Sequence, residues 1–159
     1  MIISAPALIM GNDIDTDTII PTYALQLSRD PTVFGEYAFH HTIPDFKERG
    51  EKILAAGTNF GCGSSREEAV FALMHAEVKA ILAPSFAPIF RRNAFNNALP
   101  CIEMDTSPIT DGDCLEIDFE VHTVFNSTQH TTFSFSLTPP EETLLTKGGL
   151  LSLLRERLT

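Results

Sequence analysis

The sequence predicts an α/β protein, and three observations support that fold class. Residues 52–82 have the pattern of a strand, a helix and a second strand. Residues 114–137 contain runs in which apolar and polar side chains alternate, as they do in antiparallel strands. Hydrophobic residues make up 43% of the 159 residues, which is enough for a substantial core. Since no internal repeat divides the chain, we expect one domain over residues 1–159.

The first half of the chain alternates short apolar runs with polar connections. Residues 2–10 and 52–56 are apolar runs that end at Gly11 and Gly57, which predicts two strands. Residues 21–50 between them contain prolines, aromatics and mixed charge, and so long an insert predicts a functional loop with helical pieces. We expect part of it to move or to meet a partner. Residues 65–76 are almost continuously apolar and predict a buried helix, followed by a strand over residues 78–82.

The second half becomes richer in strand signals. We expect a helix over residues 85–95 opened by a Ser85 cap, and then a strand over residues 99–104. A turn at residues 111–113 leads into a strand over residues 114–119, and residues 120–137 predict two antiparallel strands. Residues 139–158 have helix-forming composition, interrupted at Gly148 and Gly149.

Charge and cysteine content narrow the function classes. Eleven Lys and Arg against 21 Asp and Glu give a formal net charge of −10, which would repel a phosphate backbone. No apolar run reaches the roughly 18 residues of a spanning helix and no signal sequence is evident, so we expect a cytoplasmic protein. Cys62, Cys101 and Cys114 are widely spaced and odd in number, which fits neither a disulfide framework nor a self-sufficient zinc or iron–sulfur site. We therefore expect no metal ligands in this chain.

Residues 59–67 carry the strongest chemical signal. A glycine-rich turn brings Ser64, Ser65 and Arg66 to the start of a helix. Unpaired N–H groups at a helix N-terminus, the positive end of the helix dipole and a guanidinium together favour a bound carboxylate or another oxyanion. The sequence therefore predicts an anion site at this turn.

A capping box is the structural alternative at this position. Ser64 and Ser65 each stand three residues before a glutamate, which is the spacing of that motif. Against it, the glycines at positions 61 and 63 allow close approach of the backbone to a ligand. A structural cap also has no need of the arginine at position 66.

Two further polar motifs have structural interpretations. Residues 12–17 place acids at alternate positions, but a calcium loop counted from Asp13 would need glycine where Thr18 stands and glutamate where Ala24 stands. A polar turn that caps the next segment is the remaining explanation. Arg91 and Arg92 are interpreted as a solvated face or an intramolecular ion pair.

Three motifs together resemble the small-subunit family of 3-isopropylmalate dehydratase. They are GNDIDTDTIIP at residues 11–21, NFGCGSSRE at residues 59–67 and APSFAPIFRRN at residues 83–93, in the order and spacing of that family. The resemblance implies the swivelling β/β/α fold of aconitase domain 4 and a hydro-lyase reaction. It also implies a heterodimer or heterotetramer with a large subunit, which carries the 4Fe-4S cluster and its three cysteines.

The resemblance also implies roles for individual residues. Ser64 matches the serine that removes a proton from the carbon next to a carboxylate, and Ser65 and Arg66 match contacts with the substrate carboxylate. Asp15, Thr16 and Asp17 match a loop that shapes the pocket. The chain departs from the family pattern at two further positions, with Asn12 where an acid is common and Glu68 where a histidine is common.

The resemblance implies that the loop at residues 22–30 determines which substrate is chosen. The centre of this loop is Leu25, Gln26 and Leu27, which suits a substrate with an apolar branch such as isopropyl rather than an extra carboxylate. Arg29 is near in the sequence and could instead pair with a carboxylate. Isopropylmalate, and with it leucine biosynthesis, is therefore favoured, with dimethylmalate, citramalate or methylmalate, and homocitrate as alternatives. A non-catalytic anion-binding module is the alternative from another class.

Overall fold

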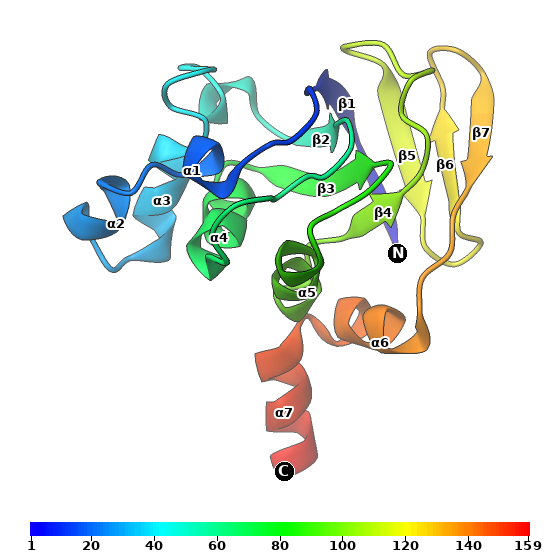
Figure 1. Cartoon of the computed structure of the whole chain (residues 1–159). Helices are drawn as coiled ribbons and strands as arrows, with labels where there is room; N and C mark the ends of the chain where they lie inside the picture. The colour runs from blue at the N-terminus through cyan, green and yellow to red at the C-terminus, as the bar shows by residue number, and fades with distance from the viewer.

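The computed structural model describes residues 1–159 and is built around one seven-stranded mixed sheet with the order β4-β3-β2-β1-β5-β6-β7 (Figure 1). The first four strands are parallel to one another, and the last three continue from β1 in antiparallel fashion. The strands are β1 (Ile2–Ile9), β2 (Lys52–Ala55), β3 (Val78–Ala83), β4 (Cys101–Glu103), β5 (Cys114–Asp118), β6 (Thr123–Asn126) and β7 (Thr131–Ser134).

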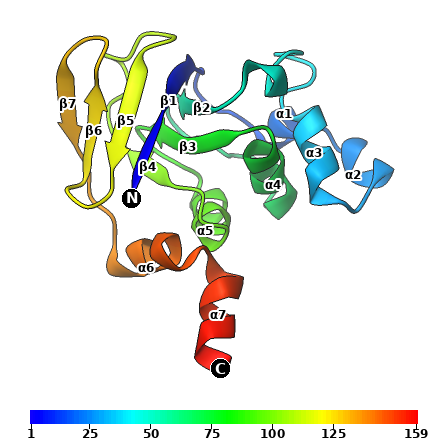
Figure 2. The ribbon, with the colours of Figure 1, turned by 180° about the vertical axis from the view of Figure 1, so that it is seen from behind.

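The helices gather beside the parallel half of the sheet (Figures 1 and 2). They are α1 (Thr16–Ile19), α2 (Ala24–Leu27), α3 (Pro31–Tyr37), α4 (Glu67–His75), α5 (Pro88–Asn96), α6 (Pro139–Lys147) and α7 (Leu150–Leu158), with a short 3-10 helix at Lys47–Arg49. The structure confirms the α/β class, the helical pieces within residues 21–50 and the break at Gly148 and Gly149. None of the helices combines the length and the apolar character needed to cross a membrane.

The sheet is buried on both faces in its parallel half. Leu54 of β2 packs with helices α3 and α4 in one apolar cluster, while Ile53 and Ala55 pack with the antiparallel strands in a second cluster. A strand covered on both faces needs apolar residues at every position. This explains why residues 52–56 form an almost unbroken apolar run, whereas β5 alternates buried and exposed residues.

Two predicted elements differ at their ends. The strand expected over residues 99–104 is limited to Cys101–Glu103, and the helix expected to begin at residue 85 begins at Pro88. The polar turn at residues 12–17 leads into the short helix α1, which the sequence did not predict as a helix. Its capping residue is Asp15, whose Oδ1 accepts from the N–H of Asp17 at 2.6 Å, which confirms the capping interpretation.

Arg91 connects helix α5 to two other elements. Its guanidinium lies 2.6 Å from the carboxylate of Glu141 on α6 and 3.3 Å from that of Glu103 on β4. The prediction of a structural ion pair is therefore confirmed for Arg91. The C-terminal helix α7 follows α6 and projects away from the body, as both views of the ribbon show (Figures 1 and 2).

Lys52 is the one lysine buried in the core. Its Nζ donates to the carbonyl of Ala76 at 2.5 Å, lies 4.4 Å from the centroid of the Phe46 ring, and the residue is 2% exposed. The bond satisfies a carbonyl at the C-terminal end of α4, where carbonyls are otherwise unpaired. Burial penalises the charged form and lowers the pKa of Lys52 to about 8.

We expect the contribution of Lys52 to stability to rise with pH. Below about pH 8 the folded and unfolded chains both hold the proton, and the cost of burying the charge is fully present. Between about pH 8 and the ordinary value of 10.5 the folded chain binds fewer protons, so its free energy of unfolding rises. Relative to Lys52→Met, wild-type stability in urea titrations should gain about 1–3 kcal/mol across this window. A difference that stays constant with pH would contradict the assignment; Lys79→Met is the exposed-lysine control and should retain the rise.

Candidate active site

The candidate site lies where two loops meet beyond the carboxyl ends of β1 and β2. The two loops form a short parallel bridge between Asp15 and Cys62. The N–H of Thr16 donates to the carbonyl of Cys62 at 2.9 Å, and the N–H of Gly61 donates to the carbonyl of Ile14 at 2.8 Å. Because β1 and β2 are parallel neighbours, both loops leave the same edge of the sheet. That edge is where open α/β sheets commonly bind ligands.

The segment before α5 joins these two loops. Phe60 forms a parallel bridge with Phe86, and its N–H donates to the carbonyl of Ser85 at 3.1 Å. The prediction that Ser85 caps the following helix is wrong, because its hydroxyl accepts from the N–H of Asn59 at 2.8 Å and Ala87 is the capping position of α5. The three motifs of the sequence therefore form one connected unit.

Two glycines allow these segments to approach one another closely. Gly63 has a φ of +92°, and a Cβ at this position would lie 2.8 Å from Oδ2 of Asp15. Gly61 has a φ of +85°, and its Cβ would overlap the ring of Phe90. Glycine tolerates both the positive φ and the close approach. The backbone before Ser64 is thereby held against Asp15 on one side and α5 on the other.

Ser64 and Ser65 lie exposed in front of α4. The capping position of this helix is Arg66, whose side chain makes no capping hydrogen bond. The capping-box interpretation is therefore wrong for both serines. Their hydroxyls and N–H groups, like the N–H of Glu67, make no hydrogen bond within the chain. Free donors at the positive end of the α4 dipole suit an oxyanion.

Arg66 supplies the positive side chain of this site. Its Nη1 lies 2.5 Å from Oδ1 of Asp17, and the two side chains are 21% and 58% exposed. Nη1 is buried and meets the distance for an ion pair, but no acceptor is aligned for a hydrogen bond. A half-exposed ion pair of this kind contributes little to stability. Arg66 can therefore exchange Asp17 for another carboxylate at small cost.

Asp15 and Thr16 are bonded within the protein beneath Ser64. Thr16 is 1% exposed, and its Oγ1 donates to the carbonyl of Ser64 at 2.9 Å. The carboxylate of Asp15 caps α1 and lies beside the backbone of Gly63. In this arrangement the two residues position the backbone of Ser64, and their direct contact with a substrate stays a prediction.

The two departures from the family pattern have different surroundings. Oδ1 of Asn12 accepts from the N–H of Thr58 at 2.8 Å, a role that a carboxylate oxygen could fill equally well. Glu68 lies half-buried in the first turn of α4, where negative charge is favourable, and makes no ion pair with Arg66. Neither departure disturbs the bonds that hold the turn in place.

The predicted specificity residues lie on the short helix α2, which sits beside α1 and α3 (Figure 1). Leu25 is half-buried and packs against the main apolar cluster, whereas Gln26 is exposed and Leu27 is 58% exposed. The hydroxyl of Tyr23 next to them lies 3.2 Å from Nε2 of His41, within hydrogen-bond distance. Of the three predicted residues, Gln26 and Leu27 are therefore the ones open to a ligand.

Apart from Arg66, the charged side chains that converge here are acidic. Partial burial and, after it, the negative charges of Asp15 and Asp13 raise the pKa of the Cys62 thiol. Cys62 is half-buried, Cys101 buried and Cys114 exposed, and all three are free. No group of three or more histidine, cysteine or acidic side chains could hold a metal ion. The residues of this chain therefore do not fit an iron–sulfur cluster, which needs several thiolates together.

Sequence reasoning placed Asp17 in the loop that shapes the pocket but did not predict that it pairs with Arg66. It belongs to the acidic run at residues 12–17, but nothing in the local pattern shows that its partner is Arg66, which is 49 positions away in the chain. The signal that could have shown this is the spacing of Asp15 and Asp17, which are two residues apart. Asp15 caps α1 from below, and Asp17, two residues on, is left on the exposed first turn.

Comparisons with known proteins agree with this geometry. Residues 14–107 match the family model described as the aconitase C-terminal domain. The 3-isopropylmalate dehydratase small subunit of Wolinella succinogenes is 45% identical over 145 residues, which cover 89% of this chain and 86% of that protein. The methanogen homoaconitase small subunit of Methanocaldococcus jannaschii is 38% identical over 161 residues, which cover 99% and 94%.

A solved structure matches over almost the whole chain. The crystal structure of 3-isopropylmalate dehydratase from Methanocaldococcus jannaschii superposes with a TM-score of 0.94 at 37% identity and covers 99% of this chain and 96% of that one. The matched family region contains the Ser64 turn, the Asp15 loop and the Phe86 segment. The chain therefore belongs to the aconitase C-terminal domain family and has the aconitase-type fold of the dehydratase small subunits.

Proposed function

We propose that this chain is the small subunit of a hydro-lyase that interconverts 2-isopropylmalate and 3-isopropylmalate by dehydration and rehydration, a step of leucine biosynthesis. The names of several relatives at 39–45% identity support this substrate. The observation that carries the proposal is the turn at residues 63–66, where free hydroxyls, free N–H groups and one guanidinium meet at the start of α4.

The proposal includes a large subunit as partner, in a heterodimer or heterotetramer. Ser64 and Ser65 are exposed, so another surface must cover them before water is excluded from a reaction. A 4Fe-4S cluster on that partner would supply a Lewis acid for the hydroxyl and a carboxylate of the substrate. Residues 1–159 would act as one domain, and the three free cysteines suit the reducing cytoplasm.

Ser64 is proposed as the base that removes the proton from the carbon next to a carboxylate. A serine hydroxyl is a weak base unless the alkoxide is stabilised. The unpaired N–H groups at the start of α4 and the nearby Arg66 favour negative charge at this position. The bond from Thr16 to the carbonyl of Ser64 would keep the serine in place while the proton moves.

Arg66 and Ser65 are proposed to hold a substrate carboxylate. The guanidinium presents a planar pair of donors that matches a carboxylate, and in the free chain Asp17 occupies one of them. A substrate carboxylate would replace Asp17. Asp15, Thr16 and Asp17 would then shape the wall of the pocket.

The side group of the substrate is assigned to α2. Leu25, Gln26 and Leu27 present no cation, and an extra carboxylate would lack a partner there. This supports an alkyl branch, whether that of isopropylmalate or the smaller branch of dimethylmalate or citramalate. The homoaconitase small subunit at 38% identity supports a tricarboxylate substrate instead.

Ser64→Ala should abolish most turnover without unfolding the chain. Because Ser64 is exposed, its hydroxyl adds nothing to the core, whereas loss of a general base typically lowers kcat about 10²–10⁴-fold. The measurement is the absorbance of the unsaturated acid formed by the reconstituted complex with its large subunit and cluster. Ser134→Ala, at an exposed serine of β7, is the matched control and should keep full activity. Near-normal turnover of Ser64→Ala in an intact complex would contradict the assignment of Ser64 as the base.

Arg66→Lys should weaken substrate binding while keeping the charge. Lysine cannot make the two parallel hydrogen bonds of a guanidinium, so we expect kcat/KM to fall about 10–100-fold, mostly through KM. Arg157→Lys, at an exposed arginine of α7 outside the site, should change kcat/KM less than twofold, roughly the scale of an exposed surface charge. Unchanged KM in Arg66→Lys would remove Arg66 from the carboxylate site.

Leu27→Arg should shift preference towards tricarboxylates. A new cation on the exposed face of α2 would pair with an extra carboxylate and would leave an isopropyl group unfavourably placed. We expect the ratio of kcat/KM for isopropylmalate over homocitrate to fall at least about tenfold. Leu27→Ala should lower kcat/KM for isopropylmalate without raising kcat/KM for homocitrate. A wild-type complex that prefers homocitrate would reject the alkylmalate assignment.

A further inference from the structure

The C-terminal helix α7 presents an apolar stripe to solvent. Leu151, Leu154 and Leu158 are 68%, 44% and 86% exposed. Their spacing of three and four residues puts them on one side of the helix, as in the seam of a coiled coil. The helix projects from the body in both views of the ribbon (Figures 1 and 2). Such a stripe on a projecting helix calls for a covering surface.

The direction of α7 is held by bonds at its start. The N–H of Gly149 donates to the carbonyl of Leu144 at 2.8 Å, and a Cβ on Gly149 would lie 2.6 Å from the carbonyl oxygen of Asn96. Lys147 on α6 pairs with Glu156 on α7 at 2.8 Å. These contacts fix α7 against the ends of α5 and α6. The rest of residues 1–159 therefore leaves the outer stripe uncovered.

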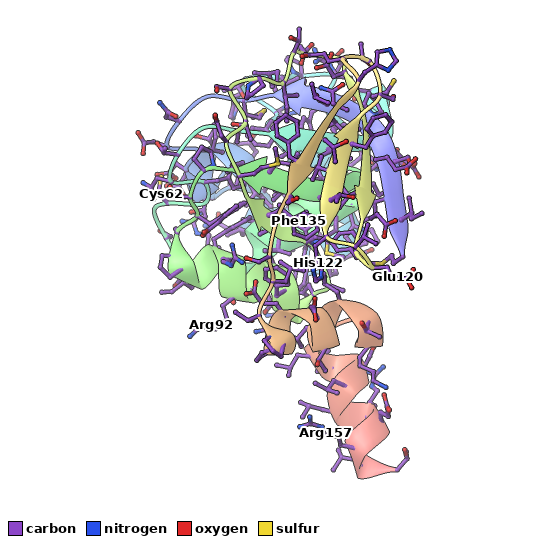
Figure 3. The ribbon with its side chains drawn as sticks, turned by 90° about the vertical axis from the view of Figure 1, so that its right-hand side faces the viewer. Cys62, Arg92, Glu120, His122, Phe135 and Arg157 are labelled. Carbon is purple, nitrogen blue, oxygen red and sulfur yellow. The ribbon has the colours of Figure 1, made fainter.

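A cavity on the opposite side of α6 has the complementary character. It measures about 710 Å³ and has apolar walls formed by Met1, Phe119, Leu137 and Leu145. Its acidic residues are Glu120 and Glu142, and it has no lysine or arginine. Figure 3 shows α6 between Glu120 and His122 on one side and Arg157 of α7 on the other.

The charges of α7 match this cavity. Arg155 and Arg157 are exposed and flank the leucine stripe, while the carboxylate of Glu156 forms an ion pair with Lys147. The C-terminal turn of α7 is therefore positive in a chain whose formal net charge is −10. His122 is paired with Glu142, which leaves the carboxylate of Glu120 unpaired at the rim. A leucine stripe flanked by two arginines suits a cavity that has apolar walls and an unpaired glutamate at its rim.

The same charges disfavour the simplest alternative, a zipper of two α7 helices. With Leu151, Leu154 and Leu158 as the seam, Arg155 and Arg157 fall on its two flanks. The flanking positions of such a seam are Leu150, Arg155 and Arg157, so in neither a parallel nor an antiparallel pair do the arginines of one helix meet an acid of the other. A zipper therefore leaves the positive charges without partners, whereas the cavity supplies them.

We propose that α7 of a second copy of this chain occupies the cavity formed by Phe119, Glu120, Leu137, Glu142 and Leu145, and that the two copies exchange α7 around a two-fold axis. Both complementary surfaces are on one chain, and a two-fold arrangement, in which each copy supplies one helix and one cavity, closes the assembly into a dimer. The surface areas buried in two symmetric contacts add together, and stable interfaces bury roughly 1,200–2,000 Å² in total. Cys62 in the candidate active site lies well away from Glu120 and Arg157 (Figure 3), so the site stays open to a large subunit. This inference goes beyond the proposed function.

Charge reversal tests the exchange on the full chain alone, by light scattering after size-exclusion chromatography. The wild type should elute at twice the chain mass. R155E/R157E and E120R/E142R should each weaken self-association at least about tenfold and elute as monomers, because like charges then meet. In an equimolar mixture of the two variants every contact is complementary again, so the mixture should recover the dimer mass.

Matched controls keep the test decisive. Glu116→Arg, at an exposed acid of β5 outside this cavity, should leave the dimer intact. Thermal melting checks that each variant is folded; if E120R/E142R is not, Glu120→Arg alone replaces it, since Glu120 is exposed and makes no ion pair within the chain. A monomeric wild type would overturn the proposal. So would dimers that survive both charge reversals, or a mixture of folded variants that stays monomeric.

Discussion

The pairing of two loops at the carboxyl edge of β1 and β2 is the constraint on which the candidate site depends. Thr16 and Gly61 each donate a backbone hydrogen bond across this junction, and Gly63 lies so close to Asp15 that a side chain would collide with the carboxylate. The pairing places Ser64 in front of α4 and Asp17 beside Arg66. A larger residue at position 63 would move the whole turn, because the positive φ and the close approach both require glycine.

The electrostatics of the site follow from that pairing. The loop after β1 brings Asp13, Asp15 and Asp17 to a place where one arginine and a helix terminus are the positive groups. The exposed carboxylate of Asp17 holds Arg66 in the free chain, and the proposed anionic substrate would have to displace it. This arrangement suits a site that gains further positive charge and shelter from a partner, because the exposed serines by themselves cannot exclude water.

Much of the fold was predictable because its signals are local. The buried run of β2, the apolar face of α4 and the break at Gly148 and Gly149 depend on residues near one another in the chain. The ends of elements were less predictable: Ser85 has the composition of a helix cap, but a distant backbone N–H, that of Asn59, claims its hydroxyl. The two serines before α4 have capping-box spacing but make no capping bond, because the helix begins after them and Arg66 occupies its capping position.

The sequence by itself determined the family, since three motifs in a fixed order identify it, and it predicted the chemical groups of the candidate site, since Ser64, Ser65 and Arg66 are adjacent in one of these motifs. The tertiary structure alone decided which of the predicted residues face outward. It placed Thr16 beneath Ser64, packed the half-buried Leu25 against the core and paired Asp17 with Arg66. These outcomes depend on backbone bonds and packing between residues that lie up to about fifty positions apart, and local pattern carries no information about such contacts.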